Sequence, residues 1–514
     1  MAEQVTTGGR PSKALRRVLV PLALAQFICS FAGSNMNVMI NDMSKDLNTT
    51  VQGIQVAITL FLLVMAALMI PGGKLTDKYG RKRLFTLGLV VYGIGALVSA
   101  IAPGLGVLIL GNSIFEGVGT AMLIPPVYIL GTLLFTEVTS RARAFGAISA
   151  AGGVGAAAGP LIGGLITSAL SWRWAFVFQA LIIALIVVLS RRVVDPLPAD
   201  PTRRFDTRGA ILSAVGLILV VMGIMATATS LWLMLGLVVA GALVLLWFFL
   251  SVRAEQRAGL EPLLSTSLFR NRTSNLGLVT QNIQWLVLLG VSFTVAAYLQ
   301  VVRGYNAIQT GVIFTAATIG VLLSSLAAER LARRWAQRTL IIAGFLGTIA
   351  GIGVFLTMVG RHPGVWAFAP GLFLIGLGVG LMLTPSVNVV QSSFGEEKQG
   401  EISGLSRSVS NLGSSLGTAI AGTILVAGIT ATPSRAYGLA MAALALLGVI
   451  GLVAGVMLPR HLTPVKATSA ATSAGAVPAP RARPDDRPDP AQSTPGPPTN
   501  ARLRPGSDGE KPLT

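Results

Sequence analysis

The chain has 514 residues, of which 53% are apolar and only 11% are charged, whereas an ordinary soluble domain carries about 25% charged residues. So few charges cannot cover a water-exposed surface, which excludes an ordinary soluble protein. The 39 Lys and Arg against 20 Asp and Glu give a net charge of +19. Because the basic residues lie in predicted loops and tails, we expect the lipid bilayer, and no nucleic acid, as the partner.

Apolar segments recur along the chain, and each is long enough to cross about 30 Å of hydrocarbon as a helix. Hydropathy therefore predicts an all-α integral membrane protein with fourteen spans. These lie near residues 18–41, 54–72, 84–102, 106–133, 142–170, 174–190, 209–229, 231–250, 275–302, 307–328, 339–359, 365–392, 402–430 and 436–458. The first apolar run is too long for a signal peptide and lacks a small-residue cleavage site, so we take it as a retained span.

The basic residues divide unequally between the two sides of the predicted membrane. With the amino end in the cytoplasm, 34 of the 39 fall in cytoplasmic segments, Arg407 among them, and 5 fall on the opposite side. A miscounted span would remove this contrast. We therefore expect an even number of spans in the inner (plasma) membrane, both termini in the cytoplasm, and no Lys or Arg at mid-membrane.

The spans group into two halves that flank a central pair. The predicted parts are a cytoplasmic N-terminus (1–17), a six-helix bundle (18–192), two inserted spans with basic linkers (193–272), a second six-helix bundle (273–459) and a disordered cytoplasmic tail (460–514). A basic loop after span 2 recurs after span 10. Such internal duplication is typical of transporters whose substrate site lies between two bundles. The tail lacks large apolar residues and cannot bury a core.

Span 1 ends in a polar stretch. Asn37 and Asn41 share one helix face, because they lie four residues apart. Asp42 follows, close in sequence to Lys45 and Asp46. The simpler interpretation of Asp42 is a solvated loop acid, and we keep it as the reserve candidate for proton uptake.

The loop after span 2 carries Gly73, Asp77, Gly80 and Arg81 within the run Gly-Lys-Leu-Thr-Asp-Lys-Tyr-Gly-Arg-Lys-Arg. Glycine permits a tight helix exit and close packing. The spacing resembles the signature of the major facilitator superfamily. The resemblance implies two six-helix bundles, here with two extra central spans, and a conformational latch formed by this loop. A generic basic loop on the cytoplasmic side is the alternative.

Span 5 contains Gly155, Gly159, Pro160, Gly163 and Gly164. Glycine at four-residue spacing lets helices approach closely, and proline bends a helix. The run is similar to the antiporter motif of the family, which implies export and a seal against ion leak. A packing seam of small residues, common in any helix bundle, is the alternative.

Span 6 opens with Ser-Trp-Arg-Trp at 171–174, similar to a signature of fourteen-span drug:proton antiporters, and the resemblance covers residues 14–459. Two positions depart from that subfamily. Ala32 stands where it usually carries Asp in span 1, and Ser113 stands where it usually carries Arg in span 4. The resemblance ties both of those residues to proton coupling, so the expected relay is missing or relocated.

Span 4 holds the most deeply placed acid. Of the 20 acidic residues, only Glu116 falls well inside a span, and Asn112 and Thr120 share its face at steps of four. A charge at mid-membrane costs several kcal/mol and is seldom retained without a use. Burial favours the protonated form of a carboxyl group, so we predict that Glu116 couples transport to protons. A neutral Glu that only packs the helices is the alternative.

Neutral amides and one aromatic side chain complete the predicted substrate cavity. In lipid such polar groups face the bundle interior, either as hydrogen-bond partners between helices or as a substrate surface. The predicted cavity residues are Asn37, Asn41, Asn112, Thr120, Gln281, Gln284, Trp285 and Asn388. Because no cation is placed at mid-membrane, organic anions are disfavoured as substrates.

The sequence has no phosphate-binding GxxxxGK[ST] loop, so ATP is not the expected energy source. The two histidines, His362 and His461, lie far apart, so we expect no metal, no cofactor and no enzyme activity. The predicted function is a monomeric secondary-active exporter that exchanges hydrophobic cationic or neutral small molecules for protons by alternating access. The alternatives are an exporter or facilitator of an endogenous lipid or metabolite without proton coupling, and a membrane sensor that uses the basic tail.

Overall fold

The computed structural model describes residues 13–135, 138–191, 193–196, 198–202, 204–226, 230–331, 334–358, 364–394, 398–428 and 433–460. Within these residues every regular element is a helix, which confirms the predicted all-α class. The predicted tail lies outside the described residues except for Arg460, and so does most of the predicted N-terminal segment.

The first six predicted spans form the first half of the fold. Its elements are α1 (Lys13–Asn35) continued by η1 (Met36–Met39) and α2 (Ile40–Asp46), α3 (Val51–Tyr79), α4 (Arg81–Ala100), α5 (Leu105–Leu108) continued by η2 (Ile109–Glu116) and α6 (Gly117–Leu134), α7 (Val138–Ala169) and α8 (Trp172–Ser190). Helix α1 packs on α7 and α8, while α4 packs on α6 and α8. Large buried rings such as Phe31, Phe85 and Phe176 fill the spaces between them.

Local sequence signals account for the ends of α3. The Thr50 hydroxyl caps its start by accepting a hydrogen bond from the backbone N of Gly53 at 3.2 Å, as expected of an N-cap residue. Gly80 ends the helix with a φ of 94°, a conformation that glycine adopts without strain. The sharp turn at Gly80 separates α3 from α4.

The remaining spans form a helix pair and the second half of the fold. The pair is α9 (Thr207–Ala226) and α10 (Leu231–Arg257), followed by η3 (Thr266–Arg270). The second half consists of α11 (Arg272–Ala297) continued by η4 (Tyr298–Val302), α12 (Ala307–Leu331), α13 (Gln337–Met358), η5 (Val365–Phe368), α14 (Ala369–Gln391), α15 (Gln399–Gly428) and α16 (Pro433–Met457). Helix α11 packs on α15 and α16, and α14 packs on α12 and α13.

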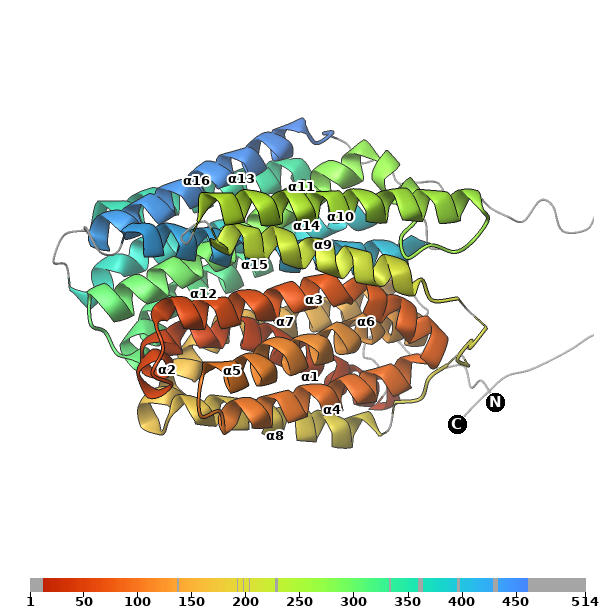
Figure 1. Ribbon diagram of the computed structural model, residues 1–514, viewed down its shortest axis with the longest axis horizontal. Helices are drawn as coiled ribbons and strands as arrows, with labels where there is room; N and C mark the ends of the chain where they lie inside the picture. Colours follow the sequence, from red (N-terminus) through yellow and green to blue (C-terminus); the bar gives the residue numbers. More distant parts are fainter. Residues whose placement is uncertain are drawn as a thin grey trace, which may run out of the picture. The chain divides into compact units, whose positions relative to one another are not determined.

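The two halves meet along two helix pairs, α3 with α15 and α7 with α12. Figure 1 shows the first half in red to yellow beside the second half in green to blue. Helix α9 contacts both α3 and α15, whereas α10 packs on α9 and is otherwise largely exposed. We call the end of the bundle that holds the turn at Gly80 the Gly80 end, and the end that holds the turn at Asn48 the Asn48 end.

The number of membrane spans is not confirmed as fourteen. Among the described residues, twelve helices are long and apolar enough to cross a membrane, or thirteen if the two bent pieces of α7 count as one span. Helix α15 is not in this set, and it carries six serines between residues 403 and 415. The crossing of the membrane by α7 and α15 stays a prediction.

Candidate substrate and coupling sites

The Glu116 carboxyl group is enclosed within the first half. It ends the π-helical segment η2 and is 0% exposed. Asn112 donates from Nδ2 to its Oε2 at 3.3 Å, and the Thr120 hydroxyl donates to its backbone carbonyl oxygen at 2.7 Å. Tyr92 and Ser99 of α4 lie beside the carboxyl group. The other oxygen, Oε1, nevertheless forms no hydrogen bond with any described group. One carboxyl oxygen is thus buried without a partner.

The surroundings of Glu116 belong to the first half alone. The Tyr92 hydroxyl donates to Oε1 of Gln179 on α8 at 2.6 Å, so α4 and α8 close off this side of the π-helical segment. The second half contacts the first mainly through α3 and α7. Glu116 therefore lies in a contact within one bundle, and it can affect a substrate between the halves only through the packing of its helices.

The two positions that depart from the antiporter pattern serve packing. Ala32 is 2% exposed in the apolar core. The Ser113 hydroxyl donates to the carbonyl oxygen of Ala57 on α3 at 2.8 Å. Neither position provides a charge near the place that the missing relay would occupy.

Asn37 and Asn41 lie at the Asn48 end, where Gln300 of the second half binds the backbone of both. Gln300 donates from Nε2 to the Asn37 carbonyl oxygen at 2.8 Å, and its Oε1 accepts from the Asn41 backbone N at 3.1 Å. The side-chain oxygen of Asn37 and both polar side-chain atoms of Asn35 are buried and have no partner in the described part of the chain. Asp42 follows in α2 and is partly buried.

Gln300 has no distinctive signal in the sequence. It lies in η4, a π-helical turn at the end of α11, opposite the interruption of α1 at η1. Broken helices at corresponding positions of two halves often mark transport sites. The contact of Gln300 with span 1 can be recognised only in the structure, where the interruptions of the two helices lie side by side.

Gln281 and Gln284 link helices inside the second half. The Ser406 hydroxyl donates to Gln281 Oε1 and the Ser386 hydroxyl donates to Gln284 Oε1, both at 2.8 Å. These bonds match the alternative role of amides as hydrogen-bond partners between helices. The Nε2 group of Gln284 is nevertheless buried without a described partner.

The last two predicted cavity residues stand apart from these amides. Trp285 is partly buried against the main apolar core, and Asn388 is exposed on α14. The predicted set therefore forms separate groups, around Glu116, around Gln300 and within α11, α14 and α15, and no described hydrogen bond joins these groups into one site.

The predicted latch residues tie the turn at Gly80 to their own half. Arg81 donates from Nη2 to Asp77 Oδ1 at 3.2 Å, and its backbone N donates to Asp195 Oδ2 at 2.7 Å in the segment after α8. Close helix packing occurs at Gly72, where an added Cβ would strike the backbone of α6, whereas a Cβ on Gly73 would make only ordinary contacts.

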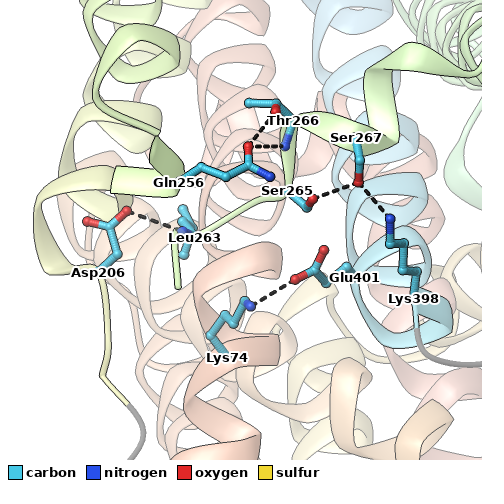
Figure 2. Close-up of polar contacts among 9 residues, drawn as sticks. All are labelled: Lys74, Asp206, Gln256, Leu263, Ser265, Thr266, Ser267, Lys398 and Glu401. Carbon is cyan, nitrogen blue, oxygen red and sulfur yellow. Dashed lines mark hydrogen bonds and ion pairs between the residues drawn. The ribbon is translucent and has the colours of Figure 1, made fainter. Parts of the chain in front are cut away.

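Lys74 and Glu401 form an ion pair between the halves (Figure 2), with 3.0 Å between Nζ and Oε1. It joins the last turns of α3 to the first turn of α15. Lys398 donates from Nζ to the Ser267 hydroxyl at 2.8 Å and so ties the start of α15 to η3. Glu401 lies 327 residues from Lys74, and no spacing rule identifies it as the partner.

The glycines of the predicted antiporter motif pack α7 against both halves. A Cβ atom on Gly155 would strike the backbone of α1, one on Gly159 would strike a serine hydroxyl of α1, and one on Gly163 would lie 3.1 Å from an α1 side chain. A Cβ on Gly164 would strike the backbone of α12, and the Pro160 carbonyl oxygen approaches a glycine of α12. The seam thus includes a contact between the halves.

The Trp-Arg-Trp run serves as an anchor at the Asn48 end. Trp172 donates from Nε1 to Asp46 Oδ2 at 3.0 Å. Arg173 pairs with the same oxygen at 3.0 Å and donates to the Ala102 carbonyl oxygen at 3.0 Å. These contacts fix the start of α8 to the end of α2 and to the turn after α4.

Arg407 lies within a helix, eight residues after the first residue of α15, and not in the connection before it. Its Nη2 donates to the hydroxyl of Tyr128 on α6, and the guanidinium carbon lies 4.8 Å from the centroid of that ring. The expectation that Arg407 belongs to a cytoplasmic loop is corrected here, because its side chain packs against the first half. Since a cation does lie between the halves, the absence of one is no longer a reason to disfavour anionic substrates.

Comparisons with known proteins agree with this architecture. Residues 22–269 and 208–418 match the Major Facilitator Superfamily. The puromycin resistance protein pur8 of Streptomyces alboniger is 32% identical over 435 residues, which cover 83% of this chain and 84% of that protein. The multidrug resistance protein Stp of Mycobacterium tuberculosis is 26% identical over 420 residues, covering 80% and 76%. The multidrug efflux pump LfrA of Mycolicibacterium smegmatis is 28% identical over 375 residues, covering 72% and 73%.

A solved structure of a POT family transporter in complex with 5-aminolevulinic acid has a TM-score of 0.63 and 17% identity, covering 86% of this chain and 96% of that chain. At this identity the likeness shows the fold alone. The family match extends over both helical halves and the inserted pair. The chain therefore belongs to the major facilitator superfamily of multi-span membrane transporters and is not an enzyme.

Proposed function

We propose that the chain is a secondary-active exporter of small amphiphilic molecules, of the multidrug-efflux type, in the plasma membrane. The observation that carries this proposal is the similarity over 83% of the chain to a puromycin resistance protein, together with relatives named as multidrug resistance and efflux proteins. We place both termini in the cytoplasm, count fourteen spans and expect the exporter to work as a monomer.

Contacts at both ends of the bundle support alternating access. Lys74 and Glu401 join the halves at the Gly80 end, and Gln300 joins them at the Asn48 end through Asn37 and Asn41. A substrate site between two halves opens to one side at a time when such contacts break in turn. Each set consists of one ion pair or a few hydrogen bonds, which transport can break and re-form.

The substrate site of the proposal lies between the halves and includes amides with unsatisfied buried groups. Three predicted cavity residues have a buried polar atom without a described partner: Asn37 Oδ1, Asn112 Oδ1 and Gln284 Nε2. Asn112 lies beside Glu116 inside the first half, so Asn37 and Gln284 are the stronger candidates. A buried polar group left unpaired costs free energy, so a ligand that pairs with it is favoured. Hydrophobic cationic and neutral molecules remain the expected cargo.

Proton exchange drives export in this proposal, with Glu116 as the coupling group. Its carboxyl group has one hydrogen bond and one unpaired oxygen. Gaining or losing a proton there changes which neighbours on α4 and in η2 can bind it. The change reaches the substrate through movement of α4, η2 and α8, because the group itself lies in the core of the first half.

The proposal is tested with purified protein in liposomes, with ethidium as the cargo. We expect ethidium transport to require an imposed proton gradient, to stop when a protonophore collapses that gradient, and to be accompanied by proton movement in the opposite direction. If the protein moves neither ethidium nor a second dye of neutral charge under any gradient, the proposed function is wrong.

One observation favours a second candidate, export without proton coupling. Ala32 and Ser113 hold no charge where the related antiporters usually have one, and Glu116 is enclosed away from the contact between the halves. The same assay separates the two candidates, because ethidium transport that continues down its own gradient after the protonophore is added, without proton movement, favours the uncoupled transporter.

A further inference from the structure

Arg407 brings a positive charge to the contact between the two halves without a negative partner. Its guanidinium comes from α15 and touches Tyr128 of α6. Throughout the described part of the chain, no carboxylate forms an ion pair with it. Arginine keeps its charge in essentially every protein environment, and a charge inside a membrane protein is costly unless it is used.

The remaining donors of Arg407 have no described acceptor in the protein. The side chain is partly buried, and neither its Nε nor its Nη1 is a buried atom without a partner. Arg81 differs in this respect, because its Nε is buried without a partner. A guanidinium has five N–H donors and Tyr128 is the one described acceptor of Arg407, so most of its donors have no described acceptor.

The first half holds this guanidinium in place through a short polar chain. The Tyr128 hydroxyl donates to Gln26 Oε1 at 3.2 Å, and Gln26 donates from Nε2 to the Ser30 hydroxyl at 3.1 Å. Gln26 also fits against Gly152 of α7, where an added Cβ would lie 2.9 Å from its Cγ. Three helices of the first half and one of the second therefore contribute to the position of one cation.

We propose that Arg407, positioned by Tyr128 and Gln26, is a subsite for a carboxylate group of the transported molecule. The planar fork of a guanidinium matches a carboxylate in two parallel hydrogen bonds. The neighbouring ring offers apolar surface for the body of an amphiphile. This inference rests on the proposed export function and extends its substrates from cationic and neutral molecules to those that carry a carboxylate.

The test compares a rhodamine that has a free carboxylate with the methyl ester of the same dye. Binding of each is measured by fluorescence with purified protein, and transport is measured in liposomes. In Arg407→Gln we expect the affinity for the carboxylate dye to fall about tenfold or more, the scale of one charge-assisted hydrogen bond, while the affinity for the ester stays unchanged. Arg407→Lys should lose less, because it keeps the charge without the fork.

Two further variants separate binding from a purely structural role. Arg257→Gln removes an exposed arginine of α10 and should leave both dyes unaffected. Tyr128→Phe removes the hydroxyl that orients the guanidinium and should weaken binding of the carboxylate dye but not of the ester. If Arg407→Gln does not yield monodisperse protein, Arg407→Lys and Tyr128→Phe are compared with the wild type instead. Each should lower the affinity for the carboxylate dye and leave the affinity for the ester unchanged.

The outcomes distinguish the subsite from the export function. Suppose that the wild type transports the ester, and that Arg407→Gln affects both dyes equally or affects neither. The subsite is then overturned, while the export function still stands. The subsite is equally overturned if the wild type binds the ester but not the carboxylate dye. If the wild type transports neither rhodamine and does not transport ethidium, the export function fails with it.

Discussion

Two single residues, Glu116 and Arg407, carry the proposed proton coupling and the proposed carboxylate subsite. Glu116 is fully enclosed in the first half, whereas Arg407 lies at the contact between the halves. Asn112 is the described hydrogen-bond donor to the Glu116 carboxyl group, and Tyr128 is the described partner of the Arg407 guanidinium. The Glu116 and Arg407 side chains share no described hydrogen-bond partner, so in the proposed mechanism a change of charge at Glu116 reaches the substrate through movement of α4, η2 and α8.

Neutralising Glu116 should uncouple transport without unfolding the protein. Glutamine has the same shape, and its side-chain oxygen can still accept the hydrogen bond from Asn112. In Glu116→Gln we expect gradient-driven ethidium transport to fall to the level measured without a gradient, while dye binding and the melting temperature stay close to those of the wild type. Liposome transport with an imposed proton gradient measures the first effect.

The control for this variant is Glu261→Gln, which neutralises an exposed acid in the connection after α10 and should transport like the wild type. Gradient-driven transport that survives in Glu116→Gln would contradict the coupling role. A large loss of stability in Glu116→Gln would instead favour the packing role for this residue.

At the level of elements, helices α1 and α7 of the first half are joined by a close contact that depends on small residues. Gly155 of α7 has no room for a Cβ atom, because the backbone of α1 lies against it, whereas Gly153 two residues earlier has open space. Overpacking a tight contact costs about 1–3 kcal/mol. The chain thus offers a matched pair of glycines on one helix.

We expect Gly155→Ala to lower stability by about 1–3 kcal/mol and to reduce transport, because α1 and α7 must move apart. Gly153→Ala should be neutral or slightly stabilising, since alanine favours a helix by about 1 kcal/mol over glycine. Thermal unfolding of detergent-purified protein compares the two. Equal effects of both changes would refute the close packing of α1 on α7.

The ion pair between α3 and α15 should bias the exporter toward the state in which the Gly80 end is closed. Both side chains are partly exposed, so the pair contributes only about 0.2–1 kcal/mol. Lys74→Glu and Glu401→Lys should each increase accessibility at the Gly80 end, and the double exchange should restore the wild-type distribution. Double electron–electron resonance between spin labels on α3 and α15 measures this, and a double variant that stays open would contradict the pairing.

Sequence patterns predict these elements better than they predict their orientation. Apolar length predicts the helices because a bilayer requires it, and charge cost identifies Glu116 as the deepest acid. The face that Glu116 presents depends on the rotation of its helix and on the π-helical turn of η2, neither of which follows from spacing. Gln300 and Glu401 pair with residues of the other half, so only the packed halves reveal them.

At the scale of the whole molecule, two helices decide how the chain crosses the membrane. In the part of the chain that the structure describes, twelve helices have the length and apolarity of spans, α7 is bent, and α15 is rich in buried serines. Serine hydroxyls donate to backbone carbonyl groups along α15, as in the bond from Ser415 to Thr59 of α3 at 3.1 Å. A helix whose polar groups bind its neighbours can cross a bilayer in spite of its composition, and this is the physical reason to keep α15 as a span.

Cysteine accessibility tests α7 and α15 separately, since the chain has one cysteine, Cys29, and it is buried. In a Cys29→Ala background, single cysteines replace Asn48, Arg257, Asn306 or Arg460, all exposed in turns or at helix ends. In the fourteen-span arrangement Asn48 and Arg257 lie on opposite sides with α7 between them, and Asn306 and Arg460 lie on opposite sides with α15 between them.

A membrane-impermeant maleimide applied to intact cells should therefore label the cysteines at 48 and 306, and label those at 257 and 460 only after the cells are opened. If α15 did not cross the bilayer, 306 and 460 would share one side, and the excess of basic residues on the cytoplasmic side would be lost for the segment after it. If the cysteines at 48 and 257 lay on one side, α7 would not cross the bilayer. Since the contact of α7 with α12 and that of α15 with α3 join the halves, losing either span would also remove the arrangement on which alternating access depends.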